Sequence, residues 1–144
     1  MLKRKPRFLF LTGFAWTALW VARLIIILIP LRKLVKAFGK DRGTEAVVPL
    51  ANQDELRRSI RIANALKLAV KYSPRSANCY PQALVARYLL KRAQVPHGLF
   101  FGLRRENDEM KAHAWVHVGP VAVTGGHSFE HYTVVRSFLS DAKT

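Results

Sequence analysis

Cys79 is the only cysteine in this chain of 144 residues, and its position suits a catalytic nucleophile. It follows the polar loop 73–77 and comes at the start of a helix predicted over residues 78–93. The free N–H groups and the dipole at a helix N-terminus stabilise a thiolate, which is the reactive form of the side chain. A lone cysteine is more often a small buried apolar residue, but that role is expected further along the helix, beside Leu84 and Leu89. Position alone therefore leaves the nucleophile and the structural residue as equal alternatives.

His113 lies in the clearest alternating strand of the chain, residues 112–118 (AHAWVHV). In a strand, His113, Trp115 and His117 share one face, and the alanines and valines between them form an apolar face that suits a core. The small neighbours of His113 leave room for another element to approach the imidazole, although a surface strand with a half-covered tryptophan explains the same pattern. Cys79 at a helix start is therefore followed along the chain by a histidine on a strand. Papain-like and transglutaminase-like enzymes have the same order, and in them the two residues form a thiolate–imidazolium pair.

Two pairs of histidines have a spacing that metal ligands use, His113 with His117 and His127 with His131. Residues four apart share one face of a helix, but on a strand they lie about 13 Å apart. The first pair is on the predicted strand and is too widely separated to hold one ion. We therefore expect no metal and no cofactor.

The elements that position Cys79 and His113 are helices followed by strands. Asn52 and Glu55 predict a capping box at the start of a helix that ends near Tyr72. Apolar residues follow at helical spacing, namely Leu56, Ile60, Ala63, Leu66 and Val70. Beyond residue 94 the pattern predicts strands over 98–105, 112–118, 121–124 and 132–138. Helices followed by an antiparallel sheet place the chain in the α+β class.

The stretch from Phe8 to Pro30 is apolar on all sides except for Arg23, and basic residues flank both of its ends. It is long enough to span a membrane, but an arginine near its middle costs about 2.5–3.5 kcal/mol on insertion. A secretory signal is disfavoured because no cleavage site of small residues follows. We expect a helix that is buried or lies at a membrane interface, with membrane-surface contact through residues 1–38. The predicted division is an apolar, basic helical segment with a linker over 1–50 and a catalytic domain over 51–144.

The net charge of +15 is unevenly distributed along the chain. Residues 1–42 contribute +9 and residues 43–144 contribute +6, so the positive charge surrounds the most apolar segment. This arrangement suits an anionic membrane surface or an acidic partner. No nucleic-acid-binding motif is visible, and aromatic residues do not alternate with basic ones, so nucleic acid is not expected as a partner.

The order of these segments resembles the lasso peptide leader peptidases, the cysteine-peptidase B proteins of lasso peptide biosynthesis. The most specific segments are Cys79 followed by Gln82-Ala83-Leu84 and later Leu89-Leu90, and the quartet Ala112-His113-Ala114-Trp115. The resemblance covers nearly the whole chain, including the hydrophobic stretch that leads into IPLRKLVKAFG. It implies a transglutaminase-like, papain-like core with Cys79 as nucleophile and His113 as general base.

The resemblance also implies a reaction and a set of partners. Such proteins remove the leader peptide from a ribosomally made lasso precursor, by way of a thiolate and an acyl-enzyme, during the maturation of a peptide antibiotic. We therefore expect the precursor, an ATP-dependent macrolactam synthetase and a leader-recognition protein as partners in the cytoplasm. The recognition protein is expected to be separate, because residues 1–50 are mostly apolar helix.

One departure from the resembled family concerns the third catalytic residue. Better-known members have an aspartate about a dozen residues after the histidine, whereas this chain has Val123-Thr124-Gly125-Gly126 there. Thr124, His127, Glu130 or a backbone carbonyl are the alternatives for orienting the imidazole. The oxyanion hole would consist of the Cys79 amide and a second donor, with Asn78 or another loop residue as candidates.

Two other functions remain open at this point. One is an acyltransferase or transglutaminase on the same fold, in which an amine rather than water resolves the thioester. The other is a non-catalytic, membrane-associated binding module in which Cys79 and His113 are structural.

Overall fold

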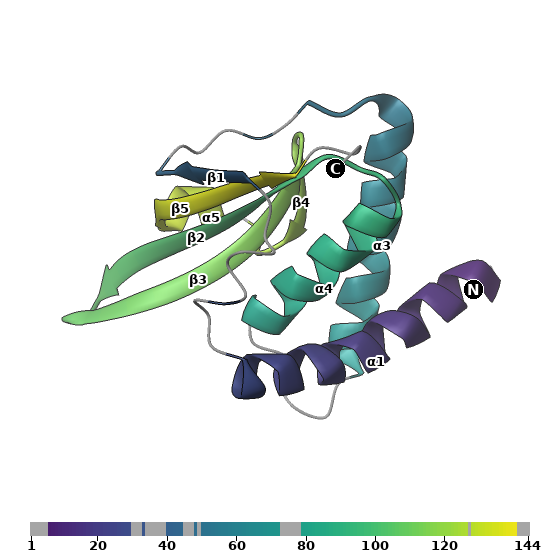
Figure 1. The fold of residues 1–144 in the computed structure, drawn as a ribbon, viewed down its shortest axis with the longest axis horizontal. Helices are drawn as coiled ribbons and strands as arrows, with labels where there is room; N and C mark the ends of the chain where they lie inside the picture. The colour runs from purple at the N-terminus through teal and green to yellow at the C-terminus, as the bar shows by residue number, and fades with distance from the viewer. Residues whose placement is uncertain are drawn as a thin grey trace.

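The computed structural model describes residues 6–29, 33, 40–44, 48, 50–72, 79–126 and 128–140, without the side chains of residues 27, 40, 42, 79, 128 and 129. The sheet, the helix pair α3 and α4, and the helix α1 form three successive layers (Figure 1). The elements run in the order α1 (Pro6–Leu28), β1 (Lys40–Gly43), α3 (Gln53–Lys71), α4 (Cys79–Arg92), β2 (His97–Glu106), β3 (Glu109–Val118), β4 (Val121–Thr124), α5 (Ser128–His131) and β5 (Thr133–Ser140).

The sheet has the strand order β1-β5-β2-β3-β4, and each neighbouring pair is antiparallel. The predicted α+β class with helices before an antiparallel sheet is therefore confirmed. β1 falls in a segment that the sequence predicted to be a linker, and it pairs with β5 at the edge of the sheet instead. Its contact with β5 includes an ion pair in which Arg136 donates to Asp41 at 2.6 Å.

Helix α3 begins where the capping box predicted. The side chain of Asn52 accepts from the Glu55 N–H at 2.8 Å, and the Glu55 carboxylate accepts from the Asn52 N–H at 2.9 Å. The buried stripe differs from the predicted one, because Ile60 is 46% exposed and its neighbour Ser59 is fully buried. Burial of Ser59 is tolerated because its hydroxyl donates to the Leu56 carbonyl within the same helix. The stripe that packs inward consists of Ser59, Ile62, Ala65, Leu66 and Ala69.

Helix α4 extends from Cys79 to Arg92, close to the predicted range of 78–93. Pro81 lies in its first turn, where the missing N–H would have had no helical partner. Val85 and Leu89 are buried, whereas Tyr88 is 45% exposed and its ring stacks on Phe14 of α1. α4 packs mainly against β3, and also against β4 and β2, so it covers the half of the sheet that ends in β4 (Figure 1).

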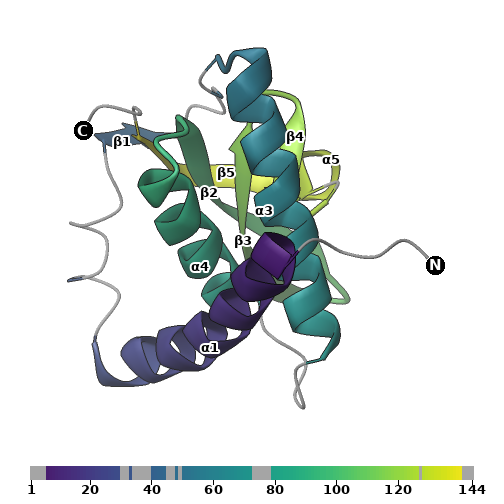
Figure 2. The same ribbon diagram turned by 90° about the vertical axis from the view of Figure 1, so that its right-hand side faces the viewer.

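Helix α1 crosses α3 and α4 on the side away from the sheet, as Figure 2 shows. Its inner face contributes Ala15, Leu19 and Ala22 to the same core as α3, α4 and the sheet. The buried orientation predicted for this segment is thus found on one face of the helix. Both α1 and the edge strand β1 precede residue 50, so elements from both sides of the predicted division at that residue form one packed body.

The two faces of the sheet differ in what they carry. Ala114, Val116 and Val118 of β3 point toward the helices and join the apolar core, as the alternation predicted. Phe100 and Trp115 point to the opposite face, where their rings stack with centroids 6.0 Å apart. Trp115 is fully buried rather than half covered, so this second face has a packed core of its own.

Candidate active site

Cys79 is the first residue of α4, so it lies at a helix start as the sequence predicted. The first turn of α4 contains no acidic residue, so no nearby carboxylate on that turn opposes a thiolate at the helix N-terminus. The Cys79 side chain and the whole of Asn78 lie outside the described residues. The nucleophilic role of Cys79 and the oxyanion role of Asn78 therefore stay predictions.

Tyr80 fixes where the tip of α4 meets the sheet. Its ring packs against Phe101 of β2 with centroids 5.7 Å apart, and Phe101 is the cross-strand partner of Ala114 on β3. The Tyr80 hydroxyl is buried without a hydrogen-bond partner among the described residues, and burial raises the pKa of the phenol to about 12. The backbone of Cys79 accordingly lies over the helix-covered face of the β2–β3 hairpin, next to a neutral phenol.

His113 lies one residue from this contact along β3, but its imidazole points to the other face of the sheet. It pairs across the strands with Gly102, and its ring stacks on Tyr132 at 4.9 Å and on Trp115 at 5.8 Å between centroids. The Arg104 guanidinium covers the far side of this cluster, 5.0 Å from the centre of the Tyr132 ring. His113 is half-buried in an aromatic stack that the sequence pattern of His113, Trp115 and His117 only partly anticipated.

The surroundings of His113 favour its neutral form. Partial burial lowers the pKa of the imidazole, and the positive charge of Arg104 lowers it further. A neutral imidazole at pH 7 has a free lone pair and can accept a proton, as a general base must. The same two effects oppose a standing imidazolium, so an ion pair with a thiolate would require the negative sulfur close by.

The described side chains do not bring a histidine to the tip of α4. His113 and His117 are both on the face of β3 turned away from the helices, because they alternate with the core residues Ala114 and Val116. His97 is on the helix-covered face, but it sits beside Arg87 and Lys91, several turns from the start of α4. The predicted contact between Cys79 and His113 depends on a thiol outside the described side chains, and it stays a prediction.

The candidates for the third catalytic residue have different surroundings. Thr124 is buried, and its hydroxyl accepts from the Val116 N–H at 3.1 Å, at the point where the β3–β4 register shifts. This hydroxyl thus stabilises the strand backbone and makes no described contact with His113. Glu130 is exposed on α5, and His127 lies outside the described residues.

A cleft of about 330 Å³ opens beside the first turn of α4, and the sequence did not predict it. Gln82, one helical turn after Cys79, lines one side, and Thr124, Gly125 and Gly126 at the end of β4 line another. Lys67 of α3 is also at its wall. Because residues three apart on a helix lie on the same side, this cleft lies close to the backbone of the predicted nucleophile. In the sequence, the segment from Cys79 to Gln82 was the feature that pointed to this region.

Among the described residues, no three histidine, cysteine, aspartate or glutamate side chains are close enough together to form a metal site. The pair His113 and His117 lies on β3, where the strand spacing separates the two rings, as the sequence argument required. The second pair includes His127 and cannot be assessed over the described part of the chain.

A comparison with known protein families identifies the superfamily of this chain. Residues 12–137 match the transglutaminase-like superfamily, which covers most of the chain, including α1 from Thr12 onward, the helix that starts at Cys79 and most of β5. No curated protein and no solved structure matches the chain significantly. The chain belongs to the transglutaminase-like superfamily, a group that includes cysteine peptidases and acyltransferases on a typically catalytic fold.

Proposed function

We propose that this transglutaminase-like protein is a cysteine endopeptidase that removes the leader peptide from a ribosomally synthesised lasso peptide precursor. The observation that carries the proposal is the position of Cys79 as the first residue of α4, in a domain of a superfamily that contains cysteine peptidases. The cleft between Gln82 and the end of β4 supports the proposal, because it is a candidate binding site for an extended peptide one helical turn from that residue.

The proposed reaction uses the helix tip to hold a thiolate. The sulfur attacks the carbonyl carbon of the last leader residue, and the negative charge that develops on its oxygen is stabilised by backbone N–H groups at the start of α4. The C–N bond then breaks as a proton passes from imidazolium to the leaving amine, which is the new N-terminus of the core peptide. Water, deprotonated by the imidazole, hydrolyses the thioester and restores the thiolate.

His113 is the proposed base, and its described position sets a condition on this mechanism. In the aromatic stack the imidazole is neutral but faces away from α4. The proposal therefore requires that the imidazole leaves its stack on Tyr132 when substrate binds. His117, on the same face of the same strand, provides a matched control for this role.

The lasso precursor as substrate rests on the resemblance of Cys79–Leu90 and Ala112–Trp115 to the leader peptidases. A peptidase of this kind acts with a separate leader-recognition protein and supplies the free amine to an ATP-dependent macrolactam synthetase. The positive charge of the chain suits a precursor or partner with acidic residues. A cytoplasmic location belongs to the same proposal.

The test is to incubate precursor with this protein and its recognition protein and to follow leader release by mass spectrometry. Cys79→Ala is expected to abolish cleavage, and His113→Ala to lower kcat/KM by about 10²–10⁴-fold. His117→Ala, a matched histidine on the same strand face, is expected to cleave within a few-fold of the wild type. Full activity of His113→Ala would remove His113 from the mechanism, and full activity of Cys79→Ala would end the peptidase proposal.

The same experiment separates peptidase from acyltransferase, which the superfamily also includes. A peptidase produces a shorter peptide with a free carboxylate. An acyltransferase produces an adduct when an amine is added, because the amine attacks the thioester before water does. A non-catalytic binding module predicts neither product, and it predicts that iodoacetamide does not label Cys79 selectively.

A further inference from the structure

The outer face of α1 is an exposed apolar stripe without charge. Its residues include Phe10 at 78%, Leu28 at 70%, Leu24 at 57% and Val21 at 51% exposure. The two charged residues of the helix, Arg7 and Arg23, lie on opposite flanks of this stripe at 100° per residue. Isolated exposed apolar residues are ordinary, but a continuous stripe of this length marks a surface that binds something apolar.

The stripe offers no hydrogen bonds to a partner. Its only hydroxyl is that of Thr17, which donates to the Gly13 carbonyl within the helix at 3.1 Å. Thr12, on the flank, likewise donates to the Phe8 carbonyl. A protein interface normally combines apolar contact with about one hydrogen bond per 100–200 Å². A surface that presents apolar side chains alone fits the acyl region of a lipid bilayer better.

One flank of the stripe on α1 has the features of a helix at a bilayer surface. Trp20 and Trp16 pack edge to face with centroids 6.1 Å apart, and Arg23 lies 5.0 Å from the centre of the Trp20 ring. Tryptophan prefers the boundary between acyl chains and headgroups, and arginine extends from an apolar surface toward the headgroups. This combination is typical of interfacial helices.

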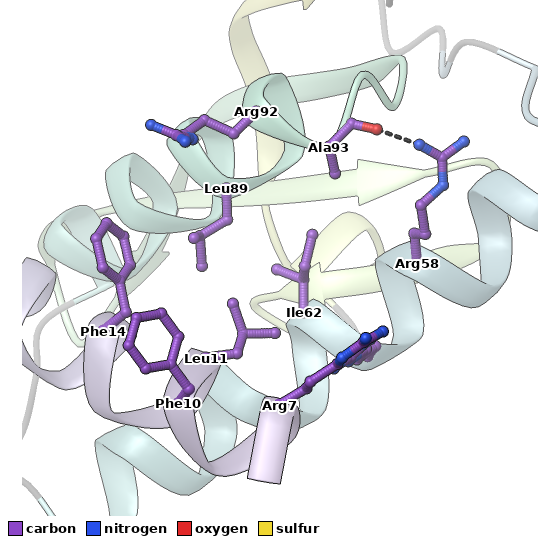
Figure 3. Close-up of a pocket in the computed structure, with 10 residues that line it drawn as sticks. Arg7, Phe10, Leu11, Phe14, Arg58, Ile62, Leu89, Arg92 and Ala93 are labelled. Carbon is purple, nitrogen blue, oxygen red and sulfur yellow. Dashed lines mark hydrogen bonds between the residues drawn. The ribbon is translucent and has the colours of Figure 1, made fainter. Parts of the chain in front are cut away.

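Positive charge surrounds a pocket that continues from the stripe. The pocket has a volume of about 590 Å³ between α1, α3 and α4, with Phe10, Leu11 and Ile62 among its apolar walls (Figure 3). Its rim holds four arginines, Arg7, Arg58, Arg61 and Arg92, and no acidic residue is among the described residues that line it. Arg58 donates to the Ala93 carbonyl and pairs with Asp54, so its charge is partly compensated. The other three give the rim a net positive charge.

The inner face of α1 decides how the helix can meet a membrane. Residues 6–26 are long and apolar enough to cross a bilayer, but Ala15, Leu19 and Ala22 are almost completely buried in the core of the protein. A spanning orientation would remove this face from α3 and α4. An orientation in the plane of the membrane keeps the core intact and buries only the outer stripe.

We propose that α1 lies in the plane of an anionic membrane surface, with its outer stripe in the acyl region and the arginine rim on lipid phosphates. An anionic lipid is favoured because basic residues lie on both sides of the stripe, with Arg23 on one flank and the arginines of the pocket rim on the other. The proposal does not depend on the peptidase reaction, since none of these residues belongs to the site at α4.

Sedimentation of the full-length protein with vesicles tests the proposal. Binding is expected to vesicles of phosphatidylcholine with one third phosphatidylglycerol, and to be weak with phosphatidylcholine alone. Leu24→Ser with Leu28→Ser is expected to weaken binding by at least about tenfold, because two exposed leucines no longer enter the acyl region. Leu50→Ser with Met110→Ser, which removes exposed apolar residues elsewhere, is the matched control and leaves binding unchanged.

A charge series tests the rim. Arg61→Gln is expected to weaken binding about fivefold, the effect of one basic residue at an anionic surface. Arg105→Gln removes the same charge at the tip of the β2–β3 hairpin and is expected to have no effect. Equal binding to neutral and anionic vesicles, or equal effects of the two substitutions, would overturn the anionic preference.

Tryptophan fluorescence distinguishes the in-plane helix from a spanning one. Trp115 is fully buried, so lipids with brominated chains are expected to quench Trp20 and Trp16 only, and Trp20→Phe to lower the quenched fraction. Bromines near the headgroup should quench more strongly than bromines at the bilayer centre. Stronger quenching at the centre would indicate a spanning helix. A stripe-dependent dimer that ignores vesicles would show that a second copy covers α1. Either outcome overturns the proposal.

Discussion

The two faces of the sheet are built from the same strands and hold different chemistry. The helix-covered face presents aliphatic residues such as Leu99, Ala114 and Val116, and helices α3 and α4 seal it from water. The opposite face presents an aromatic cluster that contains His113, Trp115 and Tyr132, and Tyr132 directly follows the short helix α5. Both faces contain packed side chains that stabilise the fold, and the aromatic face also keeps the His113 imidazole partly accessible.

Two histidines make this difference concrete. His97 on the helix-covered face is 1% exposed, and its Nδ1–H donates to the Val95 carbonyl at 2.8 Å. Burial, with the nearby charges of Arg87 and Lys91, lowers the pKa of its imidazole to about 4. His113 on the opposite face has a pKa lowered by partial burial and by Arg104. Full burial thus makes His97 a structural residue, whereas half-buried His113 keeps the capacity to exchange a proton.

Replacement of Trp115 tests whether the second face is a real core. Trp115→Ala is expected to lower the free energy of unfolding by about 3–5 kcal/mol, because a fully buried indole leaves a large cavity beside Phe100. Urea denaturation measures the loss. Trp20→Ala on the outer face of α1, where the ring is 39% exposed, is the matched control and is expected to cost less than about 1 kcal/mol.

Similar losses for the two tryptophan variants would contradict the distinction between a packed second face and an exposed surface. A small loss for Trp115→Ala alone would mean that the aromatic cluster contributes little, and that the helix-covered face provides nearly all of the stability.

The second prediction concerns the stability of the fold at acid pH, and its sign follows from His97. An unfolded histidine has a pKa near 6.5, whereas the folded pKa is about 4, so the unfolded chain binds the proton first. The stability that His97 contributes is complete above pH 6.5 and is lost as the pH falls from 6.5 to 4. The whole loss is up to about 3 kcal/mol, and about 2 kcal/mol of it falls between pH 7 and pH 5.

Urea titrations of wild type and His97→Leu at pH 7 and pH 5 measure this contribution. His113 and His117 also have lowered pKa values and act in the same direction, so the difference between the two proteins isolates His97. His131, which is exposed on α5, gives the matched control variant His131→Leu. An equal pH dependence in wild type and His97→Leu would mean that His97 is not held neutral by the core.

Much of the fold was predictable because the signals are local. The capping box of Asn52 and Glu55 fixes the start of α3, and the alternation of residues 112–118 fixes β3. β1 was not predictable, because KDRG has no strand pattern and is held by its pairing with β5 and by the Asp41–Arg136 ion pair. The error at Ile60 has a similar cause, since α3 packs against α1, β4 and α4, and these tertiary neighbours set its buried stripe.

The elements that carry Cys79 and His113 were predictable from the sequence, whereas the contact between the two side chains stays a prediction. Sequence placed Cys79 at a helix start and grouped His113 with Trp115 on one face, and the backbone agrees with both. The same alternation makes Ala114 and Val116 a core face, so any helix that packs on that face lies opposite His113. Local periodicity states which residues share a face, but it does not state which face the helix with Cys79 will cover.

The last and smallest effect concerns Gly102, which lies opposite His113 on β2. A Cβ added there would come within 2.6 Å of the Trp115 ring and 2.8 Å of the Tyr132 Cβ, so Gly102→Ala must displace the aromatic cluster. We expect a loss of about 1–3 kcal/mol in unfolding free energy, as for other overpacked cores, and a change in the His113 titration measured by NMR.

Gly13 on α1 has open space where its Cβ would be, and Gly13→Ala is expected to stabilise the helix by up to about 1 kcal/mol. Opposite signs for the two glycine variants would establish that the aromatic face is closely packed around His113. A neutral Gly102→Ala with an unchanged His113 titration would instead show that the cluster yields easily, which would favour release of the imidazole toward Cys79.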